Sequence, residues 1–420
     1  MDSVGEDAAD GMGGARGDGG DGGDSGDSGD SDGSDDSDRT EVWLFVTALS
    51  VGGAERTLVD LANGLDGERY DVTVWTIFDQ NPLADRLDDG VGLRTLGVEG
   101  VTSADHAFAV ERAADPTEYV RAPLRFLRIV RRERPAVVQS FLTADNLIAR
   151  AARLVAPDTV VITGIRLVPT GETSLVQRLD TLTTRFADHV ISNSEAGARF
   201  AREHWTPVDR VSVVHNGRDL DRFDRDPPAG LRDSLGIPDD VPVVGTVGRL
   251  IDRKGHDELL DAWVRVREER PDAHLLVVGD GPERAALAAK ADRLAVGDSV
   301  HFAGLRDDVP DLLAVMDVFV FPSHYEGLPG ALLEAMAAGL PSVATPVDGN
   351  GELIEAYESG LFFDVGDDAA MARALVLLLD RPDFAAEMGD AARRRARESF
   401  DRETMVRNFA AVYERLLAER

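Results

Sequence analysis

The 420-residue sequence contains no cysteine. This absence excludes disulfides, a thiolate nucleophile and cysteine-based zinc or iron–sulfur sites. The sequence also has no run of 18 apolar residues, so we expect no transmembrane helix. Its first residues are acidic and glycine-rich rather than basic and then apolar, so we expect no secretory signal either. These absences predict a cytoplasmic protein and leave open a peripheral contact with the inner face of the membrane.

Basic residues are scarce, and lysine is almost missing. Asp and Glu number 77 against 45 Lys and Arg, which gives a formal net charge of −32 at pH 7. A field of this sign repels nucleic acid phosphates, so we expect no nucleic-acid partner. The only lysines are Lys254 and Lys290. Such a composition suggests a high-salt cytoplasm, where a dense acidic surface stays hydrated and its self-repulsion is screened, or a genome whose codons favour arginine.

The first 39 residues differ from the rest of the chain. Of these residues, 31 are Asp, Glu, Gly or Ser, which leaves too little apolar surface to form a core. We predict that residues 1–39 are a disordered acidic tail and exclude them from the fold.

From Thr40 onward, short apolar runs alternate with helical spacing. The first unit is the apolar run 42–46, the glycine pair Gly52-Gly53 and a helix, which together predict a strand, a turn and a helix. The stretch after the second strand, up to a helix near 123–132, is predicted as a loop region. Further strands are expected at 72–77, 136–141, 160–163 and 189–193. Strands that are apolar throughout and alternate with helices predict a parallel sheet covered on both faces.

A second domain is predicted after residues 219–242, which are rich in Asp, Pro and Gly. The alternation then restarts at 243–247. We therefore predict an α/β protein with two doubly wound, Rossmann-like domains, residues 40–219 and 220–400, and a C-terminal helix, 401–420, that can cross back to the first domain. Ligands of such sheets bind beyond the carboxyl ends of the strands, so we expect the site in the cleft between the domains.

The first motif is the segment Gly248–Gly255, which follows the strand 243–247. Arg249 and Lys254 can both point toward the carboxyl end of this strand, and the glycines and the start of the next helix allow close approach of an anion. This pattern predicts a phosphate site, whereas the alternative is a charged surface turn. Because arginine replaces lysine almost everywhere else, the lysine at 254 favours a positional requirement.

The second motif spans residues 322–339. Glu326 lies in a loop after a predicted strand, Pro329 fits the first position of a helix, and Gly339 ends that helix. Glu334 lies about one turn into the helix, so the two carboxylates can face one cleft and accept hydrogen bonds from sugar hydroxyls. The nearby loop amides and the helix start favour an anionic group such as a diphosphate. The alternative is an ordinary capped helix.

The third motif, Gly52-Gly53, follows the first strand and lets the backbone approach a ligand. No G-x-G-x-x-G follows a predicted strand, which disfavours a nicotinamide or flavin enzyme. The sequence also lacks the phosphate loop G-x-x-x-x-G-K-[ST] and the hydrolase motifs H-E-x-x-H and G-x-S-x-G.

Taken together and in this order, the motifs resemble those of the family 4 glycosyltransferases, retaining enzymes with the two-domain GT-B fold. The resemblance covers about residues 41–415. Its pieces are Gly52-Gly53-Ala54-Glu55, Ser192-Asn193-Ser194, Asn216-Gly217, Gly248-Arg249-Leu250 with Lys254-Gly255, Gly279-Asp280-Gly281-Pro282, Gly304, Asp317, Pro322-Ser323, and the family's E-x7-E at Glu326 and Glu334.

The resemblance implies a nucleotide diphosphate sugar as donor, with a UDP-sugar favoured over a GDP-sugar, and no metal or separate cofactor. It implies that Arg249 and Lys254 bind the diphosphate and offset charge on the leaving group, and that Glu334 holds the ribose hydroxyls. Glu326 joins Arg249 and Lys254 as the third catalytic residue, near the donor sugar. The remaining donor contacts implied are Gly53, Leu305, Gly327, Leu328 and Pro329.

The sequence departs from the family at one position. Many members carry a histidine in the stretch that corresponds to 138–145, and this sequence has none there. Asp145, Arg166 or His106 could take its place. The alternatives are that Asp145 and Asn146 cap the following helix, that Arg166 is structural and that His106 is solvated. The two histidines that flank other motifs are expected to hydrogen-bond locally: His215 and His324.

The resemblance implies transfer of a sugar to a glycan or lipid-linked acceptor, in cell-surface polysaccharide or glycoprotein glycan synthesis. Two alternatives remain: a sugar-nucleotide epimerase of the same fold, and a non-catalytic partner that binds a nucleotide sugar. The arginine-rich stretch Arg121–Arg134 is a candidate for membrane contact, and its alternative is a solvated helix face.

Overall fold

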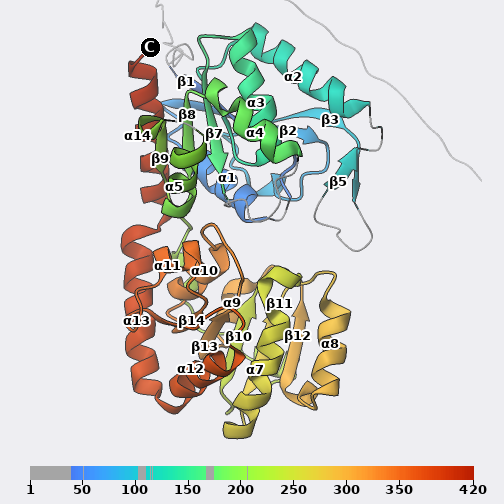
Figure 1. The fold of residues 1–420 in the computed structure, drawn as a ribbon, viewed down its shortest axis with the longest axis vertical. Coiled ribbons are helices and arrows are strands. Elements are labelled where there is room, and N and C mark those ends of the chain that lie inside the picture. Colours follow the sequence, from blue (N-terminus) through green and yellow to red (C-terminus); the bar gives the residue numbers. More distant parts are fainter. Residues whose placement is uncertain are drawn as a thin grey trace, which may run out of the picture. The chain divides into compact units, whose positions relative to one another are not determined.

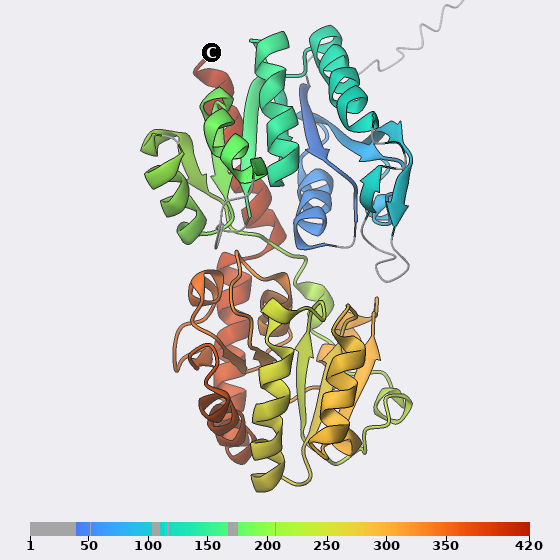
Figure 2. The ribbon, with the colours of Figure 1, turned by 45° about the vertical axis from the view of Figure 1, so that its right-hand side comes forward.

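The computed structural model describes residues 39–50, 52–102, 110–113, 115, 117–166, 175–205 and 207–420. Residues 39–420 contain two parallel sheets that follow one another along the chain, each with helices on both faces (Figure 1 and Figure 2). The predicted fold class, an α/β protein with two doubly wound sheets, is confirmed. None of the helices in the described ranges is both long and apolar enough to cross a membrane.

The first sheet has the strand order β3-β2-β1-β6-β7-β8-β9, and all neighbouring strands are parallel. Its strands are β1 (Thr40–Val46), β2 (Tyr70–Phe78), β3 (Gly92–Val98), β6 (Val137–Ser140), β7 (Val160–Ile165), β8 (His189–Ser192) and β9 (Val211–Val213). Its helices are α1 (Gly53–Gly64), α2 (Glu118–Glu133), α3 (Thr143–Val155), α4 (Leu175–Thr183) and α5 (Glu195–His204). A separate antiparallel pair consists of β4 (Gly100–Thr102) and β5 (Val110–Ala113).

The second sheet has the order β12-β11-β10-β13-β14-β15, again with parallel neighbours only. Its strands are β10 (Val243–Val247), β11 (His274–Val278), β12 (Val300–Gly304), β13 (Val318–Phe321), β14 (Ser342–Ala344) and β15 (Gly360–Phe362). The helices after the first sheet are α6 (Leu231–Ser234), α7 (His256–Glu269), α8 (Arg284–Arg293), α9 (Val309–Leu313), α10 (Gly330–Ala337), α11 (Asp348–Leu353), α12 (Asp368–Asp380), α13 (Pro382–Ser399) and α14 (Arg402–Ala418).

Each sheet has a hydrophobic core on both faces, which explains why its central strands are apolar throughout. In β1, Leu44 packs into one core, and its neighbours Trp43 and Phe45 pack into the other. In β10, Val243 and Val244 divide in the same way between the two cores of the second sheet. This arrangement follows from the alternation of side chains along a strand.

The strand orders also locate the two switch points. The chain moves outward from β1 through β2 to β3 and then crosses to β6, on the other side of β1. It makes the same move from β10 to β13 in the second sheet. Crevices for ligands form at the carboxyl ends of such strand pairs. The loops that follow β10, β13 and β1 carry the candidate residues of the first, second and third motifs, respectively.

The C-terminal helix α14 packs against the first sheet, although it follows the second sheet in sequence. Met405 and Phe409 lie in the same core as Leu44 of β1. The hydroxyl of Tyr413 donates a hydrogen bond to Oε1 of Gln139 in β6, at 2.6 Å. Figure 1 shows α14 continuing from α13 along this side of the sheet.

The stretch between β2 and α2 was predicted as a loop region, and this prediction is wrong. It contains β3, β4 and β5. Strand β3 lies at the edge of its sheet, and only Leu96 and Val98 of its seven residues are buried. An edge strand that is mostly exposed lacks the apolar run that identifies the central strands.

Candidate functional site

The loops that follow β10 and β13 form one structure. Gly255 has a φ of +69°, and a Cβ at this position would lie 2.2 Å from the carbonyl oxygen of Pro322. The amide of His324 donates to the carbonyl of Arg253 at 2.8 Å, and the Arg253 guanidinium donates to the carbonyl of Tyr325 at 3.2 Å. The first and second motifs are therefore in direct contact, because β10 and β13 are neighbours in the sheet.

Lys254 and Glu326 form an ion pair at this contact. The Lys254 Nζ lies 2.5 Å from Glu326 Oε1, and the two side chains are 14% and 9% exposed. Arg253 Nη1 is 3.6 Å from the same oxygen, and the Lys254 ammonium lies 4.8 Å from the centre of the Phe321 ring. Burial lowers the pKa of Lys254, while the charge of Glu326 opposes this shift. The structure thus places an almost buried ammonium beside the first carboxylate of the E-x7-E motif.

Arg249 and Leu305 lie outside this ion pair. Arg249 is exposed and has neither an ion pair nor a side-chain hydrogen bond within the described part of the chain. Its loop is fixed by the amide of Leu250, which donates to the carbonyl of Asp280 at 2.9 Å. Leu305, directly after β12, is 43% exposed. The structure therefore leaves both side chains accessible at the carboxyl edge of the second sheet.

The segment between the two glutamates packs against loops of the first sheet. A Cβ at Gly327 would lie 1.9 Å from the carbonyl oxygen of Arg166, so only glycine fits there without movement. The side-chain amide of Asn216 donates to the carbonyl of Leu328 at 3.1 Å and accepts a hydrogen bond from Arg166 Nη1 at 2.8 Å.

Helix α10 begins at Gly330, one residue later than the position of Pro329 predicts. Pro329 has φ −75° and ψ 119°, so it occupies the N-cap and not the first helical position. Its fixed φ is compatible with both positions. The end of the helix agrees with the prediction, because Gly339 has a φ of +78° directly after the last turn.

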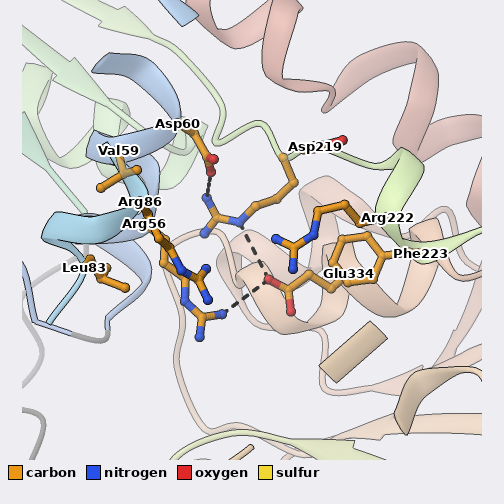
Figure 3. A pocket seen from close by; sticks show the side chains of 10 residues that line it. Arg56, Val59, Asp60, Leu83, Arg86, Asp219, Arg222, Phe223 and Glu334 are labelled. Atoms are coloured by element: carbon orange, nitrogen blue, oxygen red, sulfur yellow. Dashed lines mark hydrogen bonds and ion pairs between the residues drawn. The ribbon is translucent and has the colours of Figure 1, made fainter. Parts of the chain in front are cut away.

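Glu334, the second carboxylate of the motif, contacts two cations that are not among the predicted site residues. It is 6% exposed, and its Oε1 lies 3.7 Å from Arg56 Nη1 and 3.8 Å from Arg218 Nε (Figure 3). Burial lowers the pKa of Arg56, and the charge of Glu334 opposes this shift. Arg56 lies one turn after Gly53 in α1, and Arg218 follows Asn216-Gly217, so both adjoin motifs that the sequence did indicate.

Arg218 also connects the beginnings of two helices. Its Nη2 lies 3.4 Å from the carbonyl oxygen of Gly53, the first residue of α1, and 3.0 Å from the position of a Cβ on Gly330, the first residue of α10. Its Nη1 donates to Asp60 Oδ2 at 2.9 Å. Two helix N-termini and a guanidinium group favour negative charge at this point.

Asp145 is fully buried in the first turn of α3, which begins at Thr143. The Thr47 hydroxyl donates to its Oδ1, and its Oδ2 has no hydrogen-bond partner in the part of the chain that the structure describes. Burial raises the pKa of Asp145 to about 7; the hydrogen bond from Thr47 opposes this shift, and the nearby charge of Glu55 contributes to it. Neither Asp145 nor Asn146 is the N-cap of α3, so the capping alternative is wrong. A carboxyl group with this pKa can exchange a proton near neutral pH.

The other candidates for the missing histidine have different surroundings. Arg166 has no carboxylate partner in the described ranges, and its guanidinium lies 4.8 Å from the Phe141 ring centre. Burial lowers the pKa of Arg166 to about 10, and the charge of Arg218 adds to the shift. His106 lies outside the described residues.

The flanking histidines each hydrogen-bond to a carboxylate from a distant part of the sequence. His215 Nε2 lies 2.9 Å from Glu352 Oε2, and His324 Nε2 lies 2.9 Å from Glu258 Oε1. Across the residues that the structure describes, no group of three or more His, Asp or Glu side chains is arranged to hold a metal ion.

Comparison with known proteins identifies the class. Residues 51–222 match the model of "Glycosyltransferase Family 4", and residues 230–395 match that of "Glycosyl transferases group 1". The two matches lie on the first and second sheet and together span most of the chain. The chain therefore belongs to the family 4 glycosyltransferases with the GT-B fold.

Individual relatives are similar over part of their length. The lipopolysaccharide core biosynthesis glycosyltransferase LpsE of Rhizobium meliloti is 40% identical over 144 residues, which are 34% of this chain and 41% of LpsE. A D-inositol 3-phosphate glycosyltransferase of Streptomyces scabiei is 34% identical over 256 residues, which are 58% of this chain and 55% of the relative. The chain thus spans about half the length of these curated relatives.

Solved structures show the same fold over almost the whole chain. HepE of Anabaena, in complex with UDP and glucose, superposes with a TM-score of 0.77 at 21% identity, covering 90% of this chain and 100% of HepE. Sucrose-phosphate synthase of Thermosynechococcus elongatus gives a TM-score of 0.75 at 21% identity, covering 91% and 100% of the two chains.

Proposed function

We propose that this chain is a retaining hexosyltransferase that moves a sugar from a nucleotide diphosphate sugar to a glycan or lipid-linked acceptor. The observation that carries the proposal is the buried Lys254–Glu326 ion pair at the carboxyl edge of the second sheet, in a chain of this family. HepE was solved in complex with UDP-glucose, which supports a UDP-sugar as donor. The names of LpsE and LpsB, both of lipopolysaccharide core biosynthesis, support a role in cell-surface glycan synthesis.

In the proposed donor site, the ligand replaces carboxylates as the partner of the cations. The diphosphate replaces Glu326 as the partner of Lys254 and also pairs with the exposed Arg249, so that two cations and the start of α10 balance its charge. Glu326 is then free to accept hydrogen bonds from the donor sugar. Glu334 leaves Arg56 and accepts hydrogen bonds from the ribose hydroxyls.

The proposed reaction proceeds at one face of the sugar. The bond from the anomeric carbon to the diphosphate oxygen breaks, and a bond to the acceptor oxygen forms on the same face. The proton of the acceptor hydroxyl passes to the leaving phosphate, so the products are the glycosylated acceptor and UDP. Lys254 and Arg249 stabilise the charge that develops on the leaving group, and we propose no metal or separate cofactor.

Asp145 is our proposed substitute for the missing histidine on the acceptor side. Its carboxyl group lies beyond the carboxyl end of β1 and β6, the switch point of the first sheet, and its pKa is about 7. A carboxyl group with this pKa can bind and release a proton near neutral pH, as a histidine at this position could. Arg166, which contacts the loop of Glu326 through its backbone, has a positioning role in this proposal.

A thermal-shift panel of UDP-, GDP-, ADP- and dTDP-sugars, in multimolar KCl to suit the acidic surface, tests the donor proposal. We expect UDP and UDP-sugars to raise the melting temperature of the wild-type protein and not of Lys254→Ala. The matched control is Lys290→Ala, which removes the other lysine, held by Asp257 and Asp261. No shift with any nucleotide would contradict the proposal.

Product analysis distinguishes the proposed transferase from the two alternative functions. A sugar-nucleotide epimerase of the same fold would convert the UDP-sugar without an acceptor. A non-catalytic partner would bind the nucleotide sugar and leave it intact. Release of UDP that depends on an acceptor supports the transferase.

We also propose a cytoplasmic location, in a high-salt cytoplasm, with peripheral membrane contact through α2. Val120 and Leu124 are 66% and 47% exposed on this helix. Arg128 and Arg131, on the same face, are exposed and form no ion pair within the described ranges. Co-sedimentation with anionic vesicles tests this contact, and Arg128→Glu is expected to weaken it.

A further inference from the structure

A cavity of about 60 Å³ lies between α1 and the segment that joins the two sheets (Figure 3). Its lining comes from α1, from the loop after β2, from the joining segment and from α10. The lining residues are Arg56, Val59, Asp60, Leu83, Arg86, Arg218, Asp219, Arg222, Phe223 and Glu334. The volume is sufficient for a phosphate or carboxylate group and too small for a whole sugar nucleotide.

The charge of this lining is opposite to that of the protein. Four guanidinium groups and three carboxylates give it a net charge of +1, in a chain of net charge −32. Asp60 is already paired with Arg218 at 2.9 Å. Figure 3 shows the carboxylate of Asp219 pointing away from Glu334. Glu334 is therefore the main negative charge inside the cavity.

Two of the arginines have no anionic partner. Arg86 and Arg222 are exposed and form no ion pair with any described residue. Figure 3 shows Arg222 approaching Glu334 from one side, and Arg56 and Arg86 from the other. An anion between them would be contacted from both sides, by charge-assisted hydrogen bonds.

The cavity also contains buried donors without acceptors. Arg218 is 5% exposed, and its Nε has no hydrogen-bond partner among the described residues; Glu334 Oε1 is 3.8 Å away. The Nε of Arg56 is also buried and unpaired. Buried N–H groups are costly to leave without an acceptor, and an oxygen of an anion bound in the cavity would satisfy both of these.

The geometry points to a second anion site: we propose that this cavity binds a phosphate or carboxylate group carried by the acceptor, separate from the donor diphosphate. The inference rests on the proposed function for the identity of the acceptor. Neither Arg249, Lys254 nor Glu326 lines the cavity, so the diphosphate contacts proposed above lie elsewhere. The acceptor class is thereby narrowed to glycans or lipid-linked sugars that bear an anionic group.

Glu334 belongs to both sites, and this predicts a coupling between them. In the donor-free protein its carboxylate neutralises Arg56 and Arg218. When it turns to the ribose, these two guanidinium groups are released toward the cavity. Bound UDP therefore strengthens binding of the acceptor's anion, and the anion strengthens binding of UDP by the same factor.

Calorimetric titration of inorganic phosphate, with and without saturating UDP, tests the inference. Malonate is the matching probe for a carboxylate source. We expect phosphate or malonate to bind the UDP complex more tightly than the free protein. Arg222→Gln, an exposed position that leaves the core intact, is expected to weaken this binding at least tenfold without changing the UDP affinity. Arg86→Gln is the second variant. The charge-matched control is Arg373→Gln, at an exposed arginine of α12 that forms no ion pair with a described residue.

Three results would overturn the second site. Loss of phosphate and malonate binding when UDP is present would assign the cavity to the donor's own diphosphate. Equal anion affinity in wild type, Arg222→Gln and Arg86→Gln would exclude the cavity as the site, as would the same loss in the Arg373→Gln control. Failure of the wild type to bind UDP, with anion binding still dependent on Arg222, would instead refute the proposed donor function and leave the anion site standing.

Discussion

Replacing Glu334 by glutamine separates recognition of the ribose from recognition of the diphosphate. The change is nearly isosteric, and one amide oxygen remains as a neutral acceptor. We expect the Glu334→Gln protein to bind UDP more weakly, because a carboxylate is a stronger acceptor for the ribose hydroxyls than an amide. Binding of inorganic pyrophosphate, which has no ribose, should be unchanged or tighter, because a negative charge has been removed.

The size of the effect follows from two opposing contributions. A hydrogen bond to a charged group contributes about 1.5–3 kcal/mol, and the neutral amide retains part of this. In the donor-free protein, Glu334 is held by Arg56 and Arg218 at 3.7 and 3.8 Å, and UDP must displace these contacts. Since both distances are beyond hydrogen-bonding range, this cost is the smaller contribution. A net loss of about 2 kcal/mol corresponds to a roughly 30-fold weaker UDP affinity.

Calorimetric titration with UDP and with pyrophosphate measures both expectations on the same protein. Lys254→Met is the complementary variant, because it should weaken both ligands. Equal loss of UDP and pyrophosphate affinity in Glu334→Gln would refute the assignment of this carboxylate to the ribose. So would an unchanged UDP affinity.

Three other predictions concern buried groups. Since the pKa of Asp145 is about 7 in the folded protein against an ordinary 3.8, its contribution to stability is complete below about pH 4 and is lost as the pH rises through 7. The difference of roughly three pKa units corresponds to about 4 kcal/mol. The difference in free energy of unfolding between wild type and Asp145→Asn, measured by urea titration, should therefore change by about this amount between pH 4 and 8. Free energies of unfolding that change in parallel with pH in the two proteins would contradict this prediction. Asp180→Ala leaves the buried Arg150 without its carboxylate partner and should lower the free energy of unfolding by about 3–5 kcal/mol, measured by thermal or urea unfolding. The double change Arg150→Met with Asp180→Leu should lower it less. Equal losses of stability in the two variants would count against the buried ion pair. Glu352→Ala removes a carboxylate that accepts from the amide of Glu195 at 2.8 Å at the start of α5, so hydrogen exchange at that amide should accelerate, and unchanged protection would show that the contact is not formed in solution.

The parts of the fold that the sequence predicts are those with both faces buried. The range expected for the first strand of the second sheet, 243–247, is that of β10, because a short apolar run determines it. The edge strand β3 could not be predicted, because four of its first five residues face solvent and its pattern depends on its neighbour β2. Edge strands are specified by pairing more than by composition.

In the candidate site, too, the sequence predicts some contacts and not others. The contact between Lys254 and Glu326 follows from two loops that succeed neighbouring parallel strands, which a local motif can indicate. The partners of Glu334 come from α1 and from the joining segment, far apart in sequence. Their approach depends on how the loops of the two sheets pack, as at Gly327, and no local pattern reports it. Arg86 and Arg222 likewise lie outside any motif.

A crystal structure of the protein with UDP would show directly whether Lys254, Arg249 and Glu334 form the donor site. We expect phosphate oxygens at about 3 Å from Lys254 Nζ and from the Arg249 guanidinium, next to the start of α10, and ribose hydroxyls hydrogen-bonded to Glu334. A diphosphate bound out of reach of Lys254, or a ribose without contact to Glu334, would contradict the proposed donor site.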